Sequence, residues 1–433
     1  MYPTMYLFKK SYIMLLIDLG RTTERPLKKM NKDITLQVNR IYKQKNPSVY
    51  FRNSREIEKF VKNRKEFLFN LKLPEKLFAN SSMIDFGCGT GQNSLIYDEL
   101  GSNCTLIEYD KKSYHDCLKL FKKYAKNKFR VINKDIFKYK SKGKKYDFVI
   151  SNGVAHHTKD PKKNINICCK ILKKNGFFIL GIGNKSGFFQ RNLQRLILYK
   201  ISNNEEDIIK YAKILFKEHL KRSVKYSGRK IDEVIFDTYL NPKIETFSLS
   251  EIKKIFSKNN LILYSSYHPI KDVISFLEPN TIQFKLKKNK GNKTSNKNIK
   301  NITLSDFQDL TVSNNQTENI DLYNSIKKLY FPLDKLVKEI DNKSFERKKM
   351  NLTLKNIIDY KKRLLKIKKI NIFNNKHNKI FLNEVIKIYK ILASKKDKLK
   401  KFKNIKNYLK TTKKVFKGVS GVGMNYYVGY KIK

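Results

Sequence analysis

The order of apolar and polar positions divides the chain into an alternating part and a mainly helical part. Short apolar runs of strand length alternate with amphipathic stretches of helical period from about residue 82 to residue 181. This alternation predicts an α/β fold with a doubly wound, mostly parallel sheet. The predicted strands cover residues 82–86, 104–108, 129–133, 146–151, 177–181 and 261–267.

Helix signals lie between these strands. Asp160 followed by Pro161 is typical of a helix start, because Asp caps the first turn and Pro fits into it. Gly101 and the Asn175-Gly176 pair are predicted to end the helices that precede them. Apolar residues at spacings of three and four predict further helices over 55–69, 113–126 and 249–256.

Composition suggests how the chain is organised into domains. We expect residues 48–275 to form one domain, in which the mixed helical segment 184–247 is a lid-like insertion. Residues 276–302 are expected to be a linker because they are rich in Lys, Asn, Ser and Gly. Residues 303–417 are predicted to be a basic helical region, and 418–433 to contain a terminal strand.

Two arrangements of this C-terminal part follow from the pattern. In the first, the basic helical region is inserted before a final strand that completes the sheet. In the second, it is an appended domain that ends in a loose tail. We favour the insertion, because the strand predicted at 261–267 has no partner near it in the sequence.

Residues 1–47 are expected to be an N-terminal extension, poorly ordered at 1–29. The apolar run that opens it is too short to cross a membrane, and no other segment qualifies. Five cysteines without a CxxC pair or a zinc-ligand spacing indicate free thiols and no metal site. These features predict a cytoplasmic protein.

The net charge of +56 suggests a polyanionic partner such as RNA. Only 13 of the 94 basic residues are Arg, however, and Arg is favoured where phosphates are held bidentately. Lys, Asn, Ile and Tyr are abundant throughout, as AT-rich codons would produce. A lysine-coated surface is therefore favoured, and RNA stays an alternative partner.

The stretch 83–92 carries the strongest chemical signal. A short apolar run leads into three glycines at alternate positions, Gly87, Gly89 and Gly91. Glycine has no Cβ, so the backbone can turn sharply there and approach a ligand closely. This pattern predicts a nucleotide cradle at the start of a helix. Asp85, just before the glycines, would repel a pyrophosphate and suits a cationic group instead.

Polar residues follow the next three strands at the same edge of the predicted sheet. Glu108 ends the second strand, where an acid can accept hydrogen bonds from both ribose hydroxyls. Asp135 follows the third strand and suits an exocyclic adenine amine, with Ile136 against the ring. Asn152 lies at the tip of the fourth strand, beside the crevice where open α/β sheets bind ligands.

As a set, Asp85-Phe-Gly-Cys-Gly-Thr-Gly91, Glu108, Asp135-Ile136 and Asn152 resemble the first four motifs of class I S-adenosylmethionine-dependent methyltransferases. The resemblance covers about residues 48–270 and implies a Rossmann-like methyltransferase sheet. It also implies that S-adenosyl-L-methionine is the cofactor. In that family the glycine turn holds the methionyl part, the second acid holds the ribose, and the third reads the adenine.

A narrower resemblance links the chain to bacterial methyltransferase-domain proteins of the ubiquinone-biosynthesis type. The similar runs are Gly153-Val-Ala-His156-His157-Thr-Lys-Asp160-Pro161, Leu172-Lys-Lys-Asn-Gly176 and Asp237-x-Tyr239-x-x-Pro242. The usual Pro-Gly of the second run is replaced by Lys174-Asn175, which changes only a turn.

These motifs predict an enzyme that moves a methyl group by direct displacement to an O, N or C nucleophile. The acceptor is predicted to be a small molecule, lipid-like compound or sugar, because Ser151-Asn152-Gly153-Val154 replaces the Asn-Pro-Pro-Tyr motif that holds a base amine. One alternative is an RNA methyltransferase whose Lys-rich helices hold RNA. Another is a non-catalytic binding protein that has kept the cofactor fold.

Four further residues are candidates for contact with the acceptor. His156 and His157 follow the fourth strand, and a neutral imidazole can accept a proton from a hydroxyl nucleophile. The alternative is that one packs beneath the cofactor and the other caps the helix at Asp160. Arg191 and Tyr239 in the helical segment are candidate substrate contacts, although either residue can equally serve packing.

The glycine turn yields a direct test. Gly89→Val is expected to abolish S-adenosyl-L-methionine binding measured by calorimetry, because a branched side chain would enter the cradle. Retained binding would mean that the turn is misassigned.

Overall fold

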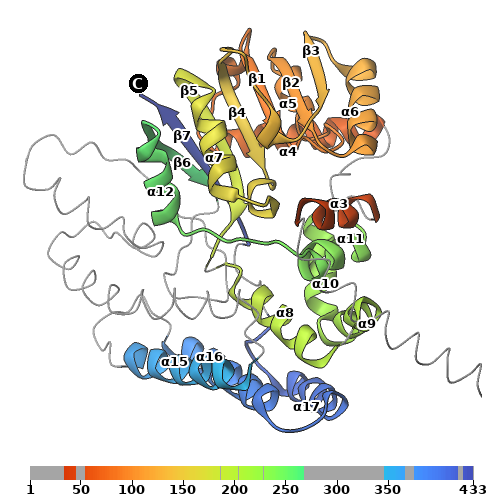
Figure 1. Ribbon diagram of the computed structural model, residues 1–433, viewed down its shortest axis with the longest axis vertical. Helices are drawn as coiled ribbons and strands as arrows, with labels where there is room; N and C mark the ends of the chain where they lie inside the picture. Colours follow the sequence, from red (N-terminus) through yellow and green to blue (C-terminus); the bar gives the residue numbers. More distant parts are fainter. Residues whose placement is uncertain are drawn as a thin grey trace, which may run out of the picture.

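The computed structural model describes residues 34–44, 54–185, 187–202, 204–227, 229–267, 346–365, 375–417 and 423–432. The predictions for residues 1–29 and 276–302, and those for the first part of the basic helical region, lie outside these ranges. Figure 1 shows an upper part built on a sheet and a lower part built of helices. No helix among the described residues has the length and apolar character needed to cross a bilayer.

Seven strands form one sheet in the order β3-β2-β1-β4-β5-β7-β6. The first five strands are parallel, and β7 runs antiparallel to both β5 and β6. This is the mostly parallel α/β sheet that the alternating pattern predicted. The strands are β1 (Ser82–Phe86), β2 (Asn103–Glu108), β3 (Phe129–Asn133), β4 (Tyr146–Asn152), β5 (Leu172–Gly183), β6 (Leu261–Tyr267) and β7 (Met424–Lys431).

Helices cover both faces of this sheet, as parallel strands require. One face packs against α4 (Ser54–Asn70), α5 (Leu95–Glu99) and α6 (Lys111–Tyr124). The other face packs against α7 (Pro161–Lys170) and α12 (Leu249–Lys258). Asp110 and Asp160 cap α6 and α7 through their side chains, which is why these helices begin where they do.

Two predicted boundaries were wrong. The helix that starts at Pro161 ends at Lys170 rather than at Asn175-Gly176, and β5 begins at Leu172. Leu172 pairs with Tyr146, and the next pair is Phe177 with Phe148, so the register shifts between them. The residues predicted to form a turn, Asn175-Gly176, therefore form an irregularity within β5. Asn175 takes a φ of 62° there. After the glycine turn, regular α-helix is limited to the short α5, and turns precede it.

The helical part combines segments that are far apart in the sequence. The helices before residue 247 share one hydrophobic core with those after residue 346, through residues such as Leu193, Ile197, Leu382 and Val385. The helices are α8 (Phe189–Ile201), α9 (Glu205–Leu215), α10 (Lys217–Ser227), α11 (Ile231–Ile235), η4 (Phe236–Leu240), α15 (Arg347–Leu365), α16 (Asn375–Ala393) and α17 (Lys398–Thr411).

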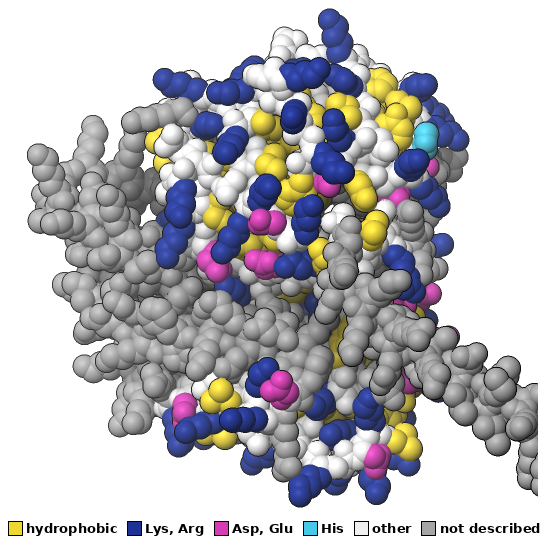
Figure 2. Space-filling view, in the orientation of Figure 1, with side chains coloured by type: hydrophobic (Ala, Val, Ile, Leu, Met, Phe, Trp, Pro, Cys, Tyr) yellow, Lys and Arg dark blue, Asp and Glu magenta, His cyan; other side chains and the backbone are white. Residues whose placement is uncertain are grey.

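Strand β7 returns the chain from the helices to the sheet. Val428 pairs with Ile179 of β5 on one side and with Ser265 of β6 on the other, so the last described strand lies inside the sheet. The strand predicted near the C-terminus therefore does complete the sheet. Figure 2 shows Lys and Arg side chains spread over both the upper and the lower part of the face in view, as a lysine-coated surface requires.

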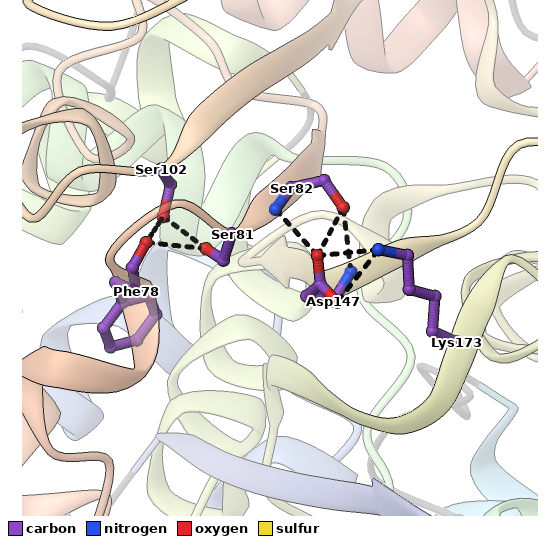
Figure 3. A network of polar contacts seen from close by, with 6 residues as sticks. All are labelled: Phe78, Ser81, Ser82, Ser102, Asp147 and Lys173. Atoms are coloured by element: carbon purple, nitrogen blue, oxygen red, sulfur yellow. Dashed lines mark hydrogen bonds and ion pairs between the residues drawn. The ribbon is translucent and has the colours of Figure 1, made fainter.

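A polar network joins the starts of β1 and β4, at the end of the sheet opposite the glycine turn (Figure 3). One carboxylate oxygen of Asp147 accepts hydrogen bonds from the Ser82 N–H (2.8 Å) and hydroxyl (2.6 Å), and Lys173 lies 2.9 Å from it. Burial alone would raise the pKa of Asp147, but these donors outweigh it and hold the pKa below its usual value. The network holds the start of β1 beside the start of β4.

We expect Val428→Ala to lower the free energy of unfolding by about 2 kcal/mol, because it leaves a cavity in the middle of the sheet. Ile432→Ala, in the same segment but 43% exposed, is the control and is expected to change little. Urea denaturation measures both. Equal effects would contradict the central position of β7.

Candidate functional site

The glycine turn follows β1 and adopts the conformation that only glycine tolerates well. Gly87, Gly89 and Gly91 have φ values of 73°, 58° and 79°. A Cβ on Gly87 would lie 2.6 Å from a methyl carbon of Val154, and one on Gly91 would lie 2.6 Å from the Cys117 sulfur. The turn is therefore closely packed, and a side chain at either position would displace it.

Glu108 at the end of β2 is bonded to this turn. Its carboxylate accepts hydrogen bonds from the Gly89 N–H and from the Asp110 N–H, each at 2.8 Å. Burial raises the pKa of Glu108, and the two N–H donors only partly offset this effect. The acid that was expected to hold a ribose thus also fixes the position of the second glycine.

Asp85 at the end of β1 is almost completely buried, with 3% of its surface exposed. One carboxylate oxygen accepts a hydrogen bond from the Ser94 hydroxyl at 2.6 Å, whereas the other has no partner among the described residues. Burial raises the pKa of Asp85 to about 7. A buried acceptor without a donor is costly, so the site suits a ligand with a cationic or N–H group.

Three further predicted residues lie at the ends of β3 and β4. Asp135 accepts a hydrogen bond from the Phe137 N–H at 2.9 Å and so caps η2 (Ile136–Lys138). Ile136 is buried, with its side chain in the core beside the site. Asn152 is the last residue of β4.

These residues surround a cavity of about 370 Å³. The structure brings nine of the predicted site residues to its wall. Gly91 is the exception among the cofactor candidates, because it faces Cys117 and Phe121 rather than the cavity. The nine residues are Asp85, Gly87, Gly89, Glu108, Asp135, Ile136, Asn152, His156 and His157.

The two histidines lie together at one part of this wall, with ring centroids 4.0 Å apart. Nδ1 of His157 lies 2.7 Å from the Lys243 carbonyl oxygen, which can only accept, so Nδ1 carries the proton. Nε2 therefore carries the lone pair in the neutral ring, and it lies 3.7 Å from the Asp237 carboxylate. Burial lowers the pKa of His157 and lowers that of His156 further.

Asp237 and Arg229 were not predicted as site residues, although Asp237 belongs to one of the similar runs. Both line the cavity, and they form an ion pair of 2.9 Å. They come from the helical segment, which is held on the histidine loop by a hydrogen bond from the Glu245 N–H to the His156 carbonyl. The motif Asp237-x-Tyr239 was the available signal, but it does not say which of its residues faces the site.

The two predicted substrate contacts lie outside the cavity wall. Tyr239 is completely buried in the core of the helical part, and its hydroxyl donates to the Gln194 side chain at 3.0 Å. Its predicted contact with the substrate does not fit this position. Arg191 lies over the Phe188 ring and beside Gly423, and it is not among the residues that line the cavity.

Residues from both ends of the chain complete the wall. The helix α3 (Ile34–Gln44) contributes Thr35, Val38 and Asn39. Strand β7 contributes Met424 and Tyr426. Neither group was predicted, because nothing local in the sequence connects these segments with the glycine turn.

Comparison with known proteins agrees with this site. A family model described as a methyltransferase domain matches residues 84–180. The curated ubiquinone biosynthesis O-methyltransferase of Pelagibacter ubique is 29% identical over 120 residues, which are 27% of this chain and 48% of that protein. The chain thus spans about half the length of the curated relative that it matches.

Two solved structures are similar to part of this chain. PKMT2 from Rickettsia typhi, solved with AdoHcy, is 18% identical, with 56% of this chain and 49% of that chain covered and a TM-score of 0.40. The magnesium protoporphyrin IX methyltransferase of Synechocystis, solved with SAH, is 15% identical, with 53% and 84% covered and a TM-score of 0.31.

The matched segment and its strand-end motifs define a class I S-adenosylmethionine-dependent methyltransferase domain. The cofactor of this domain is S-adenosyl-L-methionine. The residues present fit it: the unpartnered oxygen of Asp85 suits its ammonium group, and Glu108 suits its ribose hydroxyls. Asp135 and Ile136 offer an acceptor and an apolar surface for its adenine.

The raised pKa of Asp85 leads to a pH prediction. Below about pH 7 the carboxyl is protonated and cannot pair with an ammonium group, so cofactor affinity is expected to fall up to about tenfold per pH unit. Calorimetry from pH 5.5 to 8.5 measures this. Asp85→Asn is expected to bind weakly and with a flat profile, and a flat profile of the unaltered protein would contradict the role of Asp85.

Proposed function

We propose that the chain is an active methyltransferase whose acceptor is a small-molecule, lipid-like or sugar compound carrying an O, N or C nucleophile. Among these nucleophiles we favour a hydroxyl oxygen. The observation that carries this proposal is one cavity that holds both the cofactor residues and the His157–Asp237 pair. A volume of about 370 Å³ lies in the range of small-molecule sites. The name of the Pelagibacter relative, an O-methyltransferase, supports the same choice.

When bound, S-adenosyl-L-methionine supplies a methyl group on a sulfonium, and this group is transferred as the acceptor–carbon bond forms and the sulfur–carbon bond breaks. The chain must hold the acceptor in line and exclude water. The loop 153–158, which is buried at residues 155–157, and the helical segment that packs on it suit this task.

His157 is the residue that we propose to take the acceptor proton. The Lys243 carbonyl fixes Nδ1 as the protonated nitrogen, so Nε2 can accept a proton from a hydroxyl as it attacks. The lowered pKa keeps the ring neutral near pH 7, as a base requires. The imidazolium that results is stabilised by Asp237, whose own pKa is lowered against the effect of burial by Arg229 and His157.

The domain organisation follows from the same contacts and is also a proposal. We propose that residues 184–247 act as a lid of the methyltransferase domain 48–275, because Arg229 and Asp237 of this segment reach the cavity. The helices of 346–417 support this lid through the core that they share with it. Five buried free thiols support a reducing, cytoplasmic location.

The acceptor class is tested by a tritiated-methyl assay on separated small-molecule, lipid, RNA and protein fractions of a cell extract. Label in the small-molecule or lipid fraction is expected. Label confined to RNA would favour the RNA methyltransferase, and cofactor binding without label in any fraction would favour a non-catalytic protein.

His157→Asn is expected to lower kcat by about 100-fold or more, because the proton acceptor is removed. Its cofactor Kd is expected to stay within about twofold, since His157 contacts the Lys243 carbonyl and lies near Asp237, neither of which is fitted to the cofactor. At saturating cofactor, kcat of the unaltered enzyme is expected to fall as pH drops through the lowered pKa of His157, and the variant is expected not to show this dependence. His115→Asn, at an exposed position on α6, is the control. An unchanged kcat in His157→Asn would remove the proposed base.

A further inference from the structure

A second recess lies at the β3 edge of the sheet, where no helix among the described residues forms the usual covering layer. A crossover between parallel strands is usually a helix. The connection from β3 to β4 instead contains only η2 and a loop. The face formed there by Thr105, Arg130 and Ile132 therefore lines a recess of about 600 Å³.

The wall of this recess, as far as the described residues form it, carries six basic side chains and no carboxylate. All six are exposed, and no ion pair with another described residue holds any of them. The cofactor cavity, by contrast, includes several acidic residues in its wall. Positive charge is therefore concentrated here beyond what the general lysine content explains. The six residues are Lys128, Arg130, Lys134, Lys140, Lys142 and Lys144.

The floor of the recess offers other groups that suit a nucleic acid strand. Tyr139 is half-buried at this floor, with its hydroxyl 3.1 Å from that of the buried Tyr146, and Ile132 adds an apolar surface. Asn103 and Ser141 place an amide and a hydroxyl among the cations. Groups of this kind can bond to the 2′-hydroxyl of RNA.

We propose that this recess binds the phosphate backbone of single-stranded RNA. Exposed lysines around a groove are typical of sites that follow a strand without reading its sequence. The six exposed cations complement a polyanion, and a recess, unlike a flat surface, can enclose a single strand. Lys134 lines both the recess and the cofactor cavity, so a bound strand would lead to the mouth of the active site.

This inference does not depend on the proposed acceptor. RNA docking is measured as binding, without methyl transfer, so it can fail while the small-molecule activity stands, and the reverse also holds. It also differs from the sequence-based alternative, in which the Lys-rich C-terminal helices hold RNA, because it places the contact on the methyltransferase sheet.

The test compares two charge reversals of equal size in the full chain. The recess variant is Lys128→Glu/Lys140→Glu/Lys144→Glu. The matched control is Lys403→Glu/Lys406→Glu/Lys410→Glu, at exposed positions on α17. Binding of a fluorescent uridine RNA of about twelve nucleotides is followed by anisotropy. The salt concentration is varied from about 50 to about 300 mM, because binding to phosphates weakens steeply over this range.

The recess variant is expected to bind RNA at least about tenfold more weakly. The slope of log K against log salt concentration is expected to become shallower by about 0.7 for each phosphate that the protein no longer neutralises. The α17 variant is expected to stay within about twofold. Equal weakening in the two variants, or weakening only in the α17 variant, would overturn the proposal. So would equal affinity for DNA of the same length, or an effect on phosphatidylglycerol vesicle binding without one on RNA.

A milder variant separates charge from folding. Lys128→Gln/Lys140→Gln/Lys144→Gln removes the charges without introducing new ones and is expected to weaken RNA binding less than the reversal does. Unchanged cofactor affinity in both recess variants, measured by calorimetry, shows that the sheet is intact. Normal RNA binding by a folded glutamine variant would contradict the proposal.

Discussion

The antiparallel pairing of β7 with β5 and β6 is the interaction on which the rest of the structure depends. β7 follows the C-terminal helices in the chain, yet it lies inside the sheet, and its backbone satisfies the hydrogen bonds of strands that would otherwise be open edges. The same strand brings Met424 and Tyr426 to the cavity wall. The C-terminal helices are in turn packed on the helical segment that carries Asp237. A site assembled in this way requires the C-terminal helices and β7 to fold together with the sheet.

Electrostatics then divides the cavity into two parts. The part around the glycine turn contains buried carboxylates, of which Asp85 lacks a donor for one oxygen among the described residues. Such a group is stabilised by a cationic ligand, and a sulfonium amino acid is one. The other part contains two neutral histidines, with one proton position fixed by the Lys243 carbonyl. In the proposed function, a positive donor binds at one wall of the cavity and an acceptor proton is removed at another.

The sequence predicted the sheet and the residues that line the cavity at the strand ends well, because both depend on local signals. Continuous apolar runs mark strands that are buried on both faces, such as β1. The boundaries of β1, β3 and β6 were predicted as observed. The glycines and the acids stand at strand ends, where topology alone brings them together. Contacts between residues far apart in the sequence could not be predicted from such local signals. Asp237 faces the cavity while Tyr239, two residues further on, faces the core, and only the fold decides which does which. The contribution of β7 to the wall was hidden for the same reason.

The central claim is that the cavity behind the glycine turn is the methyl-donor site. A crystal structure of the chain with S-adenosylhomocysteine tests it most directly. We predict density in this cavity, with the ligand ammonium at Asp85, the ribose hydroxyls at Glu108 and the adenine between Asp135 and Ile136. Ligand density elsewhere, or in this cavity with the adenine at the histidines, would contradict the account.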